Sequence, residues 1–332
     1  MPADDLLDDD RRASAYDYEL SADRIAQHPA DPRDSARLLV VESPTRHSHR
    51  IFRDLPELLQ PGDLLVLNDS RVIPARLYGR KPSGAEVELL LLEERSPQNW
   101  LALVRPGKRL PPGATILFGE PESDRPFPTA KICDRDEATG GRIVEFFLPD
   151  DRPLLDWLDE LGKVPLPPYI TASDATLDDY QTIYARQPGS AAAPTAGLHF
   201  TQNLLDRLQQ HNVNITYVTL HVGVGTFRPV EAENITDHTM HSEWLQVSPD
   251  TAEAIRATKA AGGRVFAVGT TAVRSIETAA ASGEIQPYCG KTELFIYPGY
   301  RWRAIDGLIT NFHLPHSSLL LLVAALIGRS RL

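Results

Sequence analysis

The carboxyl-terminal part of the chain joins a polar segment to an apolar run. Nine consecutive apolar residues, Leu319 to Ile327, follow the segment ITNFHLPHSS. A membrane-spanning helix needs about 20 apolar residues, and a run of roughly half that length is typical of a buried helix. Ser317 and Ser318 can cap the start of a helix, and Gly328 follows the run as a helix stop. The pattern predicts a core helix that anchors the loop TNFHLP.

Short apolar runs separated by turn-forming residues occupy residues 63–148. The runs are DLLVLND, EVELLLLEE, WLALVR and GRIVEFFLP, and the segments between them are rich in proline and glycine. Strand-like runs at this spacing are typical of a small antiparallel barrel or sandwich. We therefore predict a compact β domain here.

From residue 151 onward, helical and strand-like patterns alternate. Ser248 is placed as an N-cap with Pro249 at the first helical position, and a glycine pair ends that predicted helix. Alternation of this kind predicts an α/β domain with functional loops at the carboxyl ends of its strands. The predicted helices are 152–163, 201–211, 248–263 and 271–283, and the predicted strands are 214–222 and 264–270.

These patterns predict two domains, as expected for a chain of 332 residues. A larger mixed α/β domain consists of residues 16–61 and 151–332, and a small antiparallel β domain of residues 62–150, a barrel or a sandwich, is inserted into it. Loop tips tolerate such insertions. Residues 1–15 are acidic and lack the features of a signal peptide, so we expect a disordered leader and a cytoplasmic protein with no membrane contact.

The formal net charge of −11 argues against indiscriminate binding of nucleic acid, which requires positive surface. A local basic groove is still compatible with this charge, because Arg71, Arg76, Arg80 and Lys81 cluster in NDSRVIPARLYGRK.

The two cysteines, Cys133 and Cys289, are too few and too far apart for a disulfide framework or a cysteine zinc site. They are expected to be free thiols in a reducing compartment.

Two glycine-containing loops follow predicted strands. In AVGTTAVRSIE, Gly269, Thr270 and Thr271 open a helix, whose free N–H groups could bind a carboxylate or a phosphate. Threonine capping of a structural helix explains the pattern as well. In HVGVGTFRPVE, Gly223 and Gly225 allow close approach of a ligand, beside His221. A lone histidine is more often structural, and neither a P-loop nor a dinucleotide fingerprint is complete.

Three further segments carry candidate residues. Thr195 and His199 lie in GSAAAPTAGLHFT, where the histidine could act as an acid or base near neutral pH. The segment HTMHSEW brings two histidines close to Glu243 in sequence, but no third ligand set accompanies them, so we expect no metal site. Asn68 and Asp69 end a predicted strand, where Asp69 could equally form a structural ion pair. Together with TNFHLP, six loops of this kind suggest a site.

The combined motifs resemble the S-adenosylmethionine:tRNA ribosyltransferase-isomerase family. The motifs are YDYEL with IAQHPADPRDSARLLV, LQPGDLLVLNDSRVIPARL, AAAPTAGLHFT, HVGVGTFRPV, AVGTTAVRSIE and LFIYPGYRWRAIDGLITNFHLPHSSLLLLVAAL, and they extend from Tyr16 to Gly328. The resemblance implies a larger α/β domain with an inserted β-barrel. It also implies transfer and isomerisation of the ribosyl part of S-adenosylmethionine onto the 7-aminomethyl-7-deazaguanine base of tRNA, giving epoxyqueuosine.

In the mechanism proposed for this family, a base removes a proton next to the sulfonium and gives an ylide. Adenine and methionine leave. S-adenosylmethionine is then a co-substrate, no cofactor is expected, and the partner is a tRNA carrying the precursor base at the wobble position. We expect a monomer.

This chemistry assigns roles by residue type. The candidate bases are His199, His221 and His313, with Glu243 as a further candidate catalytic residue. The candidate S-adenosylmethionine-binding residues are Asn68, Asp69, Thr195, Gly223, Gly225, Thr270, Thr271 and Asn311. The candidate tRNA-binding residues are Arg71, Arg76, Arg80, Lys81 and Arg228.

The sequence departs from the family pattern at two points. Family members usually continue into an aromatic, acidic tail, whereas this sequence ends at GRSRL, and His316 stands where a basic residue usually follows HLP. Two alternative functions stay open at this point. One is a tRNA-binding module with impaired catalysis, and the other is an S-adenosylmethionine-dependent methyltransferase.

Overall fold

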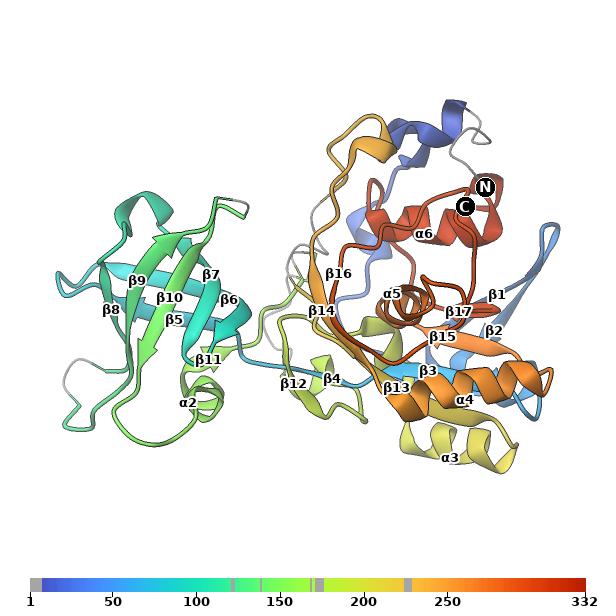
Figure 1. Cartoon of the computed structure of the whole chain (residues 1–332), viewed down its shortest axis with the longest axis horizontal. Helices are drawn as coiled ribbons and strands as arrows, with labels where there is room; N and C mark the ends of the chain where they lie inside the picture. Colours follow the sequence, from blue (N-terminus) through green and yellow to red (C-terminus); the bar gives the residue numbers. More distant parts are fainter. Residues whose placement is uncertain (1–7, 121–122, 138, 168, 171–175, 224–228) are drawn as a thin grey trace. The chain divides into compact units, whose positions relative to one another are not determined.

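The computed structural model describes residues 8–120, 123–137, 139–167, 169–170, 176–223 and 229–332. The chain divides into two compact units (Figure 1). The larger unit contains Met1–Ser70, Pro168–Gln187 and Ala193–Leu332, and the smaller unit contains Arg71–Pro167 and Pro188–Ala192. The predicted fold class, a mixed α/β unit with an inserted antiparallel barrel, is confirmed.

The smaller unit is a closed antiparallel barrel. Alternate residues of its strands point inward, so that Leu89, Leu91, Val144 and Phe146 are almost completely buried. A bridge between β5 and β8 closes the barrel, and β11 (Gly162–Lys163) extends β5 outside the ring. In spatial order the six barrel strands are β5 (Arg76–Arg80), β6 (Glu86–Ser96), β7 (Asn99–Arg105), β10 (Arg142–Phe147), β9 (Thr129–Arg135) and β8 (Thr115–Leu117).

The larger unit is built on a six-stranded sheet whose four adjacent strands β13, β3, β15 and β17 are parallel. Every residue of β3 is buried, as is typical of a central parallel strand. The carboxyl ends of these four strands therefore meet at one edge of the sheet. In order, the strands are β16 (Tyr288–Thr292), β14 (Glu243–Val247), β13 (Asn214–Leu220), β3 (Leu64–Asn68), β15 (Val265–Val268) and β17 (Gly307–Ile309).

Capped helices connect and cover these strands (Figure 1). Thr201 caps α3 (Gln202–Gln210) by accepting a hydrogen bond from the Leu204 N–H, and the buried leucines of α3 pack with β3. Ser248 caps α4 (Pro249–Ala260), as predicted. The remaining elements are α5 (Thr270–Ala279), the hairpin of β1 (Arg37–Ser43) and β2 (Arg46–Ile51), α1 (Leu55–Leu58), β4 (Ser70–Val72) and β12 (Gln187–Ser190).

The carboxyl-terminal apolar run forms the predicted buried helix, α6 (Ser318–Ile327). The Ser317 hydroxyl accepts a hydrogen bond from the Leu320 N–H at 3.2 Å, and Gly328, with φ of +82°, ends the helix. Leu320 and Leu321 pack against Tyr16 in one apolar cluster. Among the described residues, no helix is long and apolar enough to cross a membrane.

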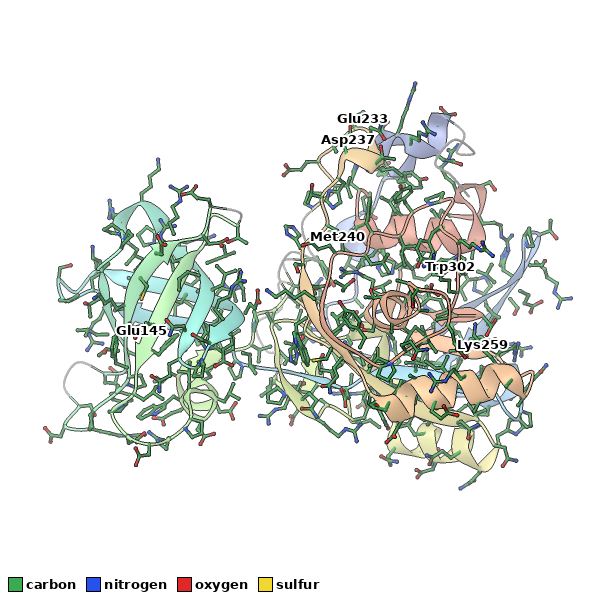
Figure 2. The ribbon with its side chains drawn as sticks, viewed as in Figure 1. Glu145, Glu233, Asp237, Met240, Lys259 and Trp302 are labelled. Carbon is green, nitrogen blue, oxygen red and sulfur yellow. The ribbon has the colours of Figure 1, made fainter. Side chains whose placement is uncertain are left out.

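A buried carboxylate fixes the segment that leads into β17. Glu277 has no exposed surface, and it accepts hydrogen bonds from the backbone N–H groups of residues 303–305 and from the Tyr300 hydroxyl. Trp302, labelled in Figure 2, donates its indole N–H to the Ala325 carbonyl of α6 at 3.3 Å. Lys259 of α4, also labelled there, donates to the Arg303 carbonyl.

Two sequence-based domain boundaries differ from the structure. Residues 64–68 are predicted in the inserted domain, but they form β3 of the larger sheet. The prediction fails because a short apolar run is equally compatible with a strand of a barrel and with a strand of a parallel sheet. The helix α2 (Leu154–Leu161) belongs to the smaller unit, where Trp157 packs against Phe127.

The predicted disordered leader is wrong for residues 8–15. Two short 3-10 helices, Asp8–Arg11 and Ala13–Tyr16, are ordered there because Ala13 and Tyr16 bury their side chains in the cluster that contains α6. Asp10 also pairs with Arg329 at 2.6 Å.

The burial of α6 can be tested with Leu321→Ala. The side chain is 2% exposed, so its truncation should lower the free energy of unfolding by about 2–5 kcal/mol. Leu332→Ala serves as the control, because Leu332 is 51% exposed and its truncation should cost less than about 0.5 kcal/mol. Denaturant unfolding monitored by circular dichroism measures both. Equal losses for the two variants would show that α6 is not a core helix.

Candidate active site

The candidate residues gather where four parallel strands end. Asn68 closes β3, His221 follows β13, Gly269 follows β15, and Asn311 and His313 follow β17. Since these strands are neighbours in the sheet, their following loops lie side by side. Ligands of open α/β sheets bind outside the carboxyl ends of the strands. We call this region the carboxyl edge.

The carboxamide of Asn68 ties three parts of the carboxyl edge together. Its side chain is 1% exposed. The amide nitrogen donates to the Leu220 carbonyl at 3.0 Å and to Thr271 Oγ1 at 3.2 Å. The amide oxygen accepts from the N–H groups of Ser70 and Leu220, each at 3.1 Å. The predicted binding residue Asn68 thus uses its polar atoms to fix β13 and α5 beside β3.

The start of α5 offers free N–H groups at this edge. Gly269 has φ of +86°, a conformation that favours glycine, and its N–H donates to the Ile309 carbonyl at 2.8 Å. Because Gly269 at the N-cap has no side chain, it cannot accept hydrogen bonds from the N–H groups of Thr271 and Ala272, as a capping side chain would. The partial positive charge of a helix start favours an anion at this position.

His199 and Asn311 come together, although they are distant in sequence. The 3-10 helix η9 (Thr195–His199) places His199 Nε2 at 3.0 Å from Asn311 Oδ1, and the backbone of Arg33 also hydrogen-bonds to the imidazole. Burial lowers the pKa of His199. Gly197 is required in η9, since a Cβ there would lie 2.1 Å from the Tyr184 hydroxyl oxygen.

His221 is stacked and partly dehydrated at the end of β13. Its ring lies on Trp244 with a centroid separation of 5.1 Å and an interplanar angle of 18°. Burial lowers the pKa of His221, and the nearby Asp69 carboxylate opposes that shift. The buried Nδ1 atom has no hydrogen-bond partner among the described residues.

His313 is the most strongly shifted of the three histidines. Burial lowers its pKa to about 4, so it is neutral at pH 7. Its Nε2 atom lies 3.1 Å from Thr310 Oγ1, and its backbone carbonyl accepts a hydrogen bond from the Tyr18 hydroxyl. The imidazole is therefore part of a fixed turn.

Glu243 forms a buried ion pair with Arg274 of α5, and both side chains are at most 5% exposed. The second carboxylate oxygen of Glu243 accepts a hydrogen bond from the Gly223 N–H at 3.1 Å. Arg274 also donates to the carbonyls of Leu294 and Thr292. Both carboxylate oxygens of Glu243 thus have partners that hold the loop after β13 to α5.

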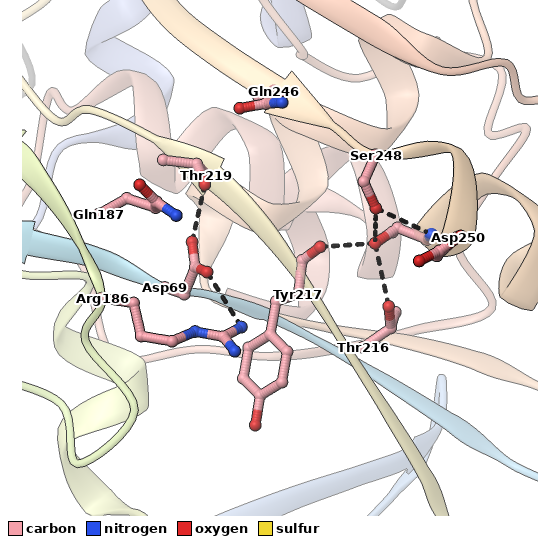
Figure 3. Close-up of a pocket in the computed structure, with 10 residues that line it drawn as sticks. Asp69, Arg186, Gln187, Thr216, Tyr217, Thr219, Gln246, Ser248 and Asp250 are labelled. Atoms are coloured by element: carbon pink, nitrogen blue, oxygen red, sulfur yellow. Dashed lines mark hydrogen bonds and ion pairs between the residues drawn. The ribbon is translucent and has the colours of Figure 1, made fainter.

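A cavity of about 400 Å³ lies beside β13 (Figure 3). At one end of it, the buried Asp69 carboxylate pairs with Arg186 at 3.1 Å and accepts a hydrogen bond from the Thr219 hydroxyl at 2.7 Å. The Arg186 guanidinium lies 4.3 Å from the centre of the Tyr217 ring. The other residues that line this cavity are Gln187, Thr216, Gln246, Ser248, Asp250 and Thr251.

Comparison with known proteins shows which family the chain resembles. The family model described as "Queuosine biosynthesis protein" matches residues 13–332. The chain is 57% identical to the S-adenosylmethionine:tRNA ribosyltransferase-isomerase of Trichormus variabilis, covering 96% of this chain and 85% of the relative. The protein of that name from Desulfitobacterium hafniense is 50% identical, with 96% and 92% covered.

A solved structure is also similar. The crystal structure of S-adenosylmethionine tRNA ribosyltransferase from Thermotoga maritima is 39% identical, covers 96% of this chain and 91% of its own, and has a TM-score of 0.51. The chain belongs to the S-adenosylmethionine:tRNA ribosyltransferase-isomerase family.

In this family member, four of the five predicted tRNA-binding residues lie in the smaller unit, where they contact other residues of that unit. Arg71 pairs with Asp159 at 3.5 Å, and Arg76 pairs with Glu88 at 2.6 Å. Arg80 and Lys81 donate to backbone carbonyls. The two further candidates Gly225 and Arg228 lie outside the described residues.

One of the two histidines near Glu243 in sequence packs against an aromatic ring. His238 packs against Phe295 with ring centroids 5.1 Å apart, and burial lowers its pKa. Within the part of the chain that the structure describes, no group of three or more histidine, cysteine or acidic residues comes together in a way that could hold a metal ion.

The ribosyltransferase-isomerase site also contains residues that the sequence analysis missed. Arg274 is one of them, and its signal was a single arginine within the otherwise small and apolar start of α5. Trp244 and Arg186 carried no such signal, because an aromatic in a strand and an arginine in a loop are common. Thr195 lies at the start of η9, in the loop whose Ala196 faces Gly269.

The buried state of His313 predicts a pH dependence of stability. Its pKa is 6.5 when exposed and about 4 in the fold, so between these values the unfolded chain binds more protons. Stability should therefore fall as the pH is lowered from 6.5 to 4, by up to about 3 kcal/mol from this residue. His313→Gln should lose less stability than the wild type over this window.

Urea unfolding at each pH measures the effect. His49→Gln is the matched control, because it removes an exposed histidine of β2. If the wild type and His313→Gln lose the same free energy between pH 6.5 and 4, His313 is not held in a dehydrated position.

Proposed function

We propose that this protein transfers the ribosyl part of S-adenosylmethionine to the 7-aminomethyl-7-deazaguanine base of tRNA and isomerises it, giving epoxyqueuosine-tRNA, adenine and methionine. The observation that carries this proposal is the identity of 50–58% with proteins of that name over 96–98% of this chain. S-adenosylmethionine is a co-substrate, and we propose that no further cofactor takes part. Cytoplasmic tRNA is the partner, and the protein acts as a monomer.

We assign the base to His221. A base must be neutral at the working pH and must have a free nitrogen within reach of the acidic proton. The lowered pKa of His221 satisfies the first requirement, and its Nδ1 has no hydrogen-bond partner among the described residues. The rings of His199 and His313 already hydrogen-bond to Asn311 and Thr310, so they serve as positioning residues.

We propose that Glu243 is a positioning residue and does not itself accept the substrate proton. Its carboxylate holds the Gly223 N–H and the Arg274 guanidinium, which fixes the loop that follows His221. A carboxylate committed to a buried ion pair is a poor acceptor for a substrate proton, because protonation would leave the arginine charge unpaired.

The substrate groups are assigned by chemistry. The methionine carboxylate binds at the start of α5, near Thr270 and Thr271, where the helix dipole favours an anion. The ribose hydroxyls bind near Asp69 and Asn311, whose side-chain oxygens can accept additional hydrogen bonds. Asn68 holds the scaffold, since its carboxamide is committed to four protein hydrogen bonds.

The tRNA phosphates are assigned to the cluster of Arg71, Arg76, Arg80 and Lys81, and to Arg228. The ion pair between Arg71 and Asp159 is about half exposed. Such pairs contribute only about 0–1 kcal/mol, so an arginine can exchange its carboxylate partner for a phosphate at little cost.

The reaction is tested with S-adenosylmethionine and tRNA that bears the precursor base. The wild type should release adenine and methionine. His221→Ala should slow the single-turnover rate by about 100-fold or more while the unfolding transition is retained. Formation of S-adenosylhomocysteine would identify a methyltransferase instead, and tight tRNA binding without adenine release would identify a binding module.

The phosphate contacts are tested by salt dependence. Arg76→Ala should reduce the slope of log affinity for tRNA against log salt by about 0.7–0.9. Arg135→Ala is the control, because Arg135 is another ion-paired barrel arginine outside the NDSRVIPARLYGRK motif. If both variants keep the wild-type slope and affinity, the phosphate-binding surface lies elsewhere.

A further inference from the structure

One aromatic side chain is far more exposed than the other large apolar residues. Phe312 is 86% exposed, whereas the next most exposed large apolar residue of the described chain, Leu332, is 51% exposed. A phenylalanine in this state contributes almost nothing to the core, because burial of apolar area is what stabilises the fold. Its exposure therefore has no structural explanation within the larger unit.

The backbone that carries Phe312 is held on both sides. Before it, Asn311 is bonded to His199 at 3.0 Å. After it, His313 is bonded to Thr310 and its carbonyl accepts from the Tyr18 hydroxyl. The His316 carbonyl accepts a hydrogen bond from the Val230 N–H at 2.8 Å. The ring thus projects from a fixed turn, and little conformational entropy is lost when a ligand covers it.

The position of the ring matches the proposed chemistry. Phe312 follows β17 by three residues and stands between Asn311 and His313 at the carboxyl edge. The acceptor in the proposed reaction is an unpaired base of an anticodon loop. Proteins that recognise single-stranded RNA loops stack their unpaired bases on aromatic side chains.

We propose that Phe312 binds tRNA by stacking on an unpaired nucleobase of the anticodon loop, next to the reacting centre. This inference rests on the proposed function. The net charge of −11 adds weight to it, since a net-acidic protein gains little long-range attraction for RNA and depends more on short-range contacts. The face of the ring, rather than its apolar area, is the feature that the base recognises.

The proposal is tested with Phe312→Ala, Phe312→Leu and Phe312→Trp. Stacking on one base contributes about 1–3 kcal/mol, so Phe312→Ala should raise the KM for tRNA by about 5- to 150-fold. The KM for S-adenosylmethionine and the Tm should stay at their wild-type values, because the ring lies outside the core. Phe312→Trp should stay within a few-fold of the wild type, and Phe312→Leu should resemble Phe312→Ala.

Phe147→Ala is the matched control, since Phe147 of β10 is a 48% exposed phenylalanine that belongs to the smaller unit. It should keep the wild-type KM for tRNA. If wild-type protein releases no adenine, the proposed function fails, whatever the variants do. If the wild type is active and Phe312→Ala keeps its KM for tRNA, or Phe312→Leu behaves as the wild type, stacking is wrong. A change of sedimentation in Phe312→Ala with an unchanged KM would instead identify a contact between copies of the chain.

Discussion

The carboxamide of Asn68 is the constraint on which the rest of the site depends. A buried amide must have its donors and acceptors satisfied, because each unmet group costs about 1–3 kcal/mol. Asn68 meets this requirement only if the end of β13, the Ser70 N–H and the Thr271 hydroxyl are all in place. One side chain on the central strand thereby sets the relative positions of three loops at the carboxyl edge, before any substrate binds. Preorganisation of this kind is what a demanding reaction needs.

Burial then determines which groups can do chemistry. His199, His221 and His313 all have lowered pKa values because the carboxyl edge is partly dehydrated, so each is neutral at pH 7. Hydrogen bonding separates their roles, since the first and third already have side-chain partners. The two carboxylates also have protein partners: Glu243 pairs with Arg274, and Asp69 pairs with Arg186 and accepts a hydrogen bond from Thr219. Phe312 differs from these residues, because its ring is exposed and can stack on a planar ligand.

Local patterns in the sequence were sufficient to predict α3, α4 and α6, together with the caps of α4 and α6, because capping and helical periodicity are short-range properties. The turn spacing predicted a small antiparallel β domain, and the family resemblance predicted that it is a barrel. The boundary at β3 was missed because a five-residue apolar run does not say which sheet it joins. The motifs supplied most of the candidate residues. Which of these residues come into contact depends on the strand order β13-β3-β15-β17, and no local pattern encodes that order. The exposure of Phe312 was not predicted, because an apolar residue close in sequence to a core helix is usually buried.

The central claim is that the carboxyl edge is the active site, and the position of bound S-adenosylmethionine tests it most directly. A crystal structure of the protein soaked with S-adenosylmethionine in the absence of tRNA should place the methionine carboxylate at the N–H groups of Thr270 and Thr271. The ribose carbon next to the sulfonium should lie close to the imidazole of His221. Density confined to the cavity beside β13 and the start of α4, with the carboxyl edge empty, would contradict the account (Figure 3).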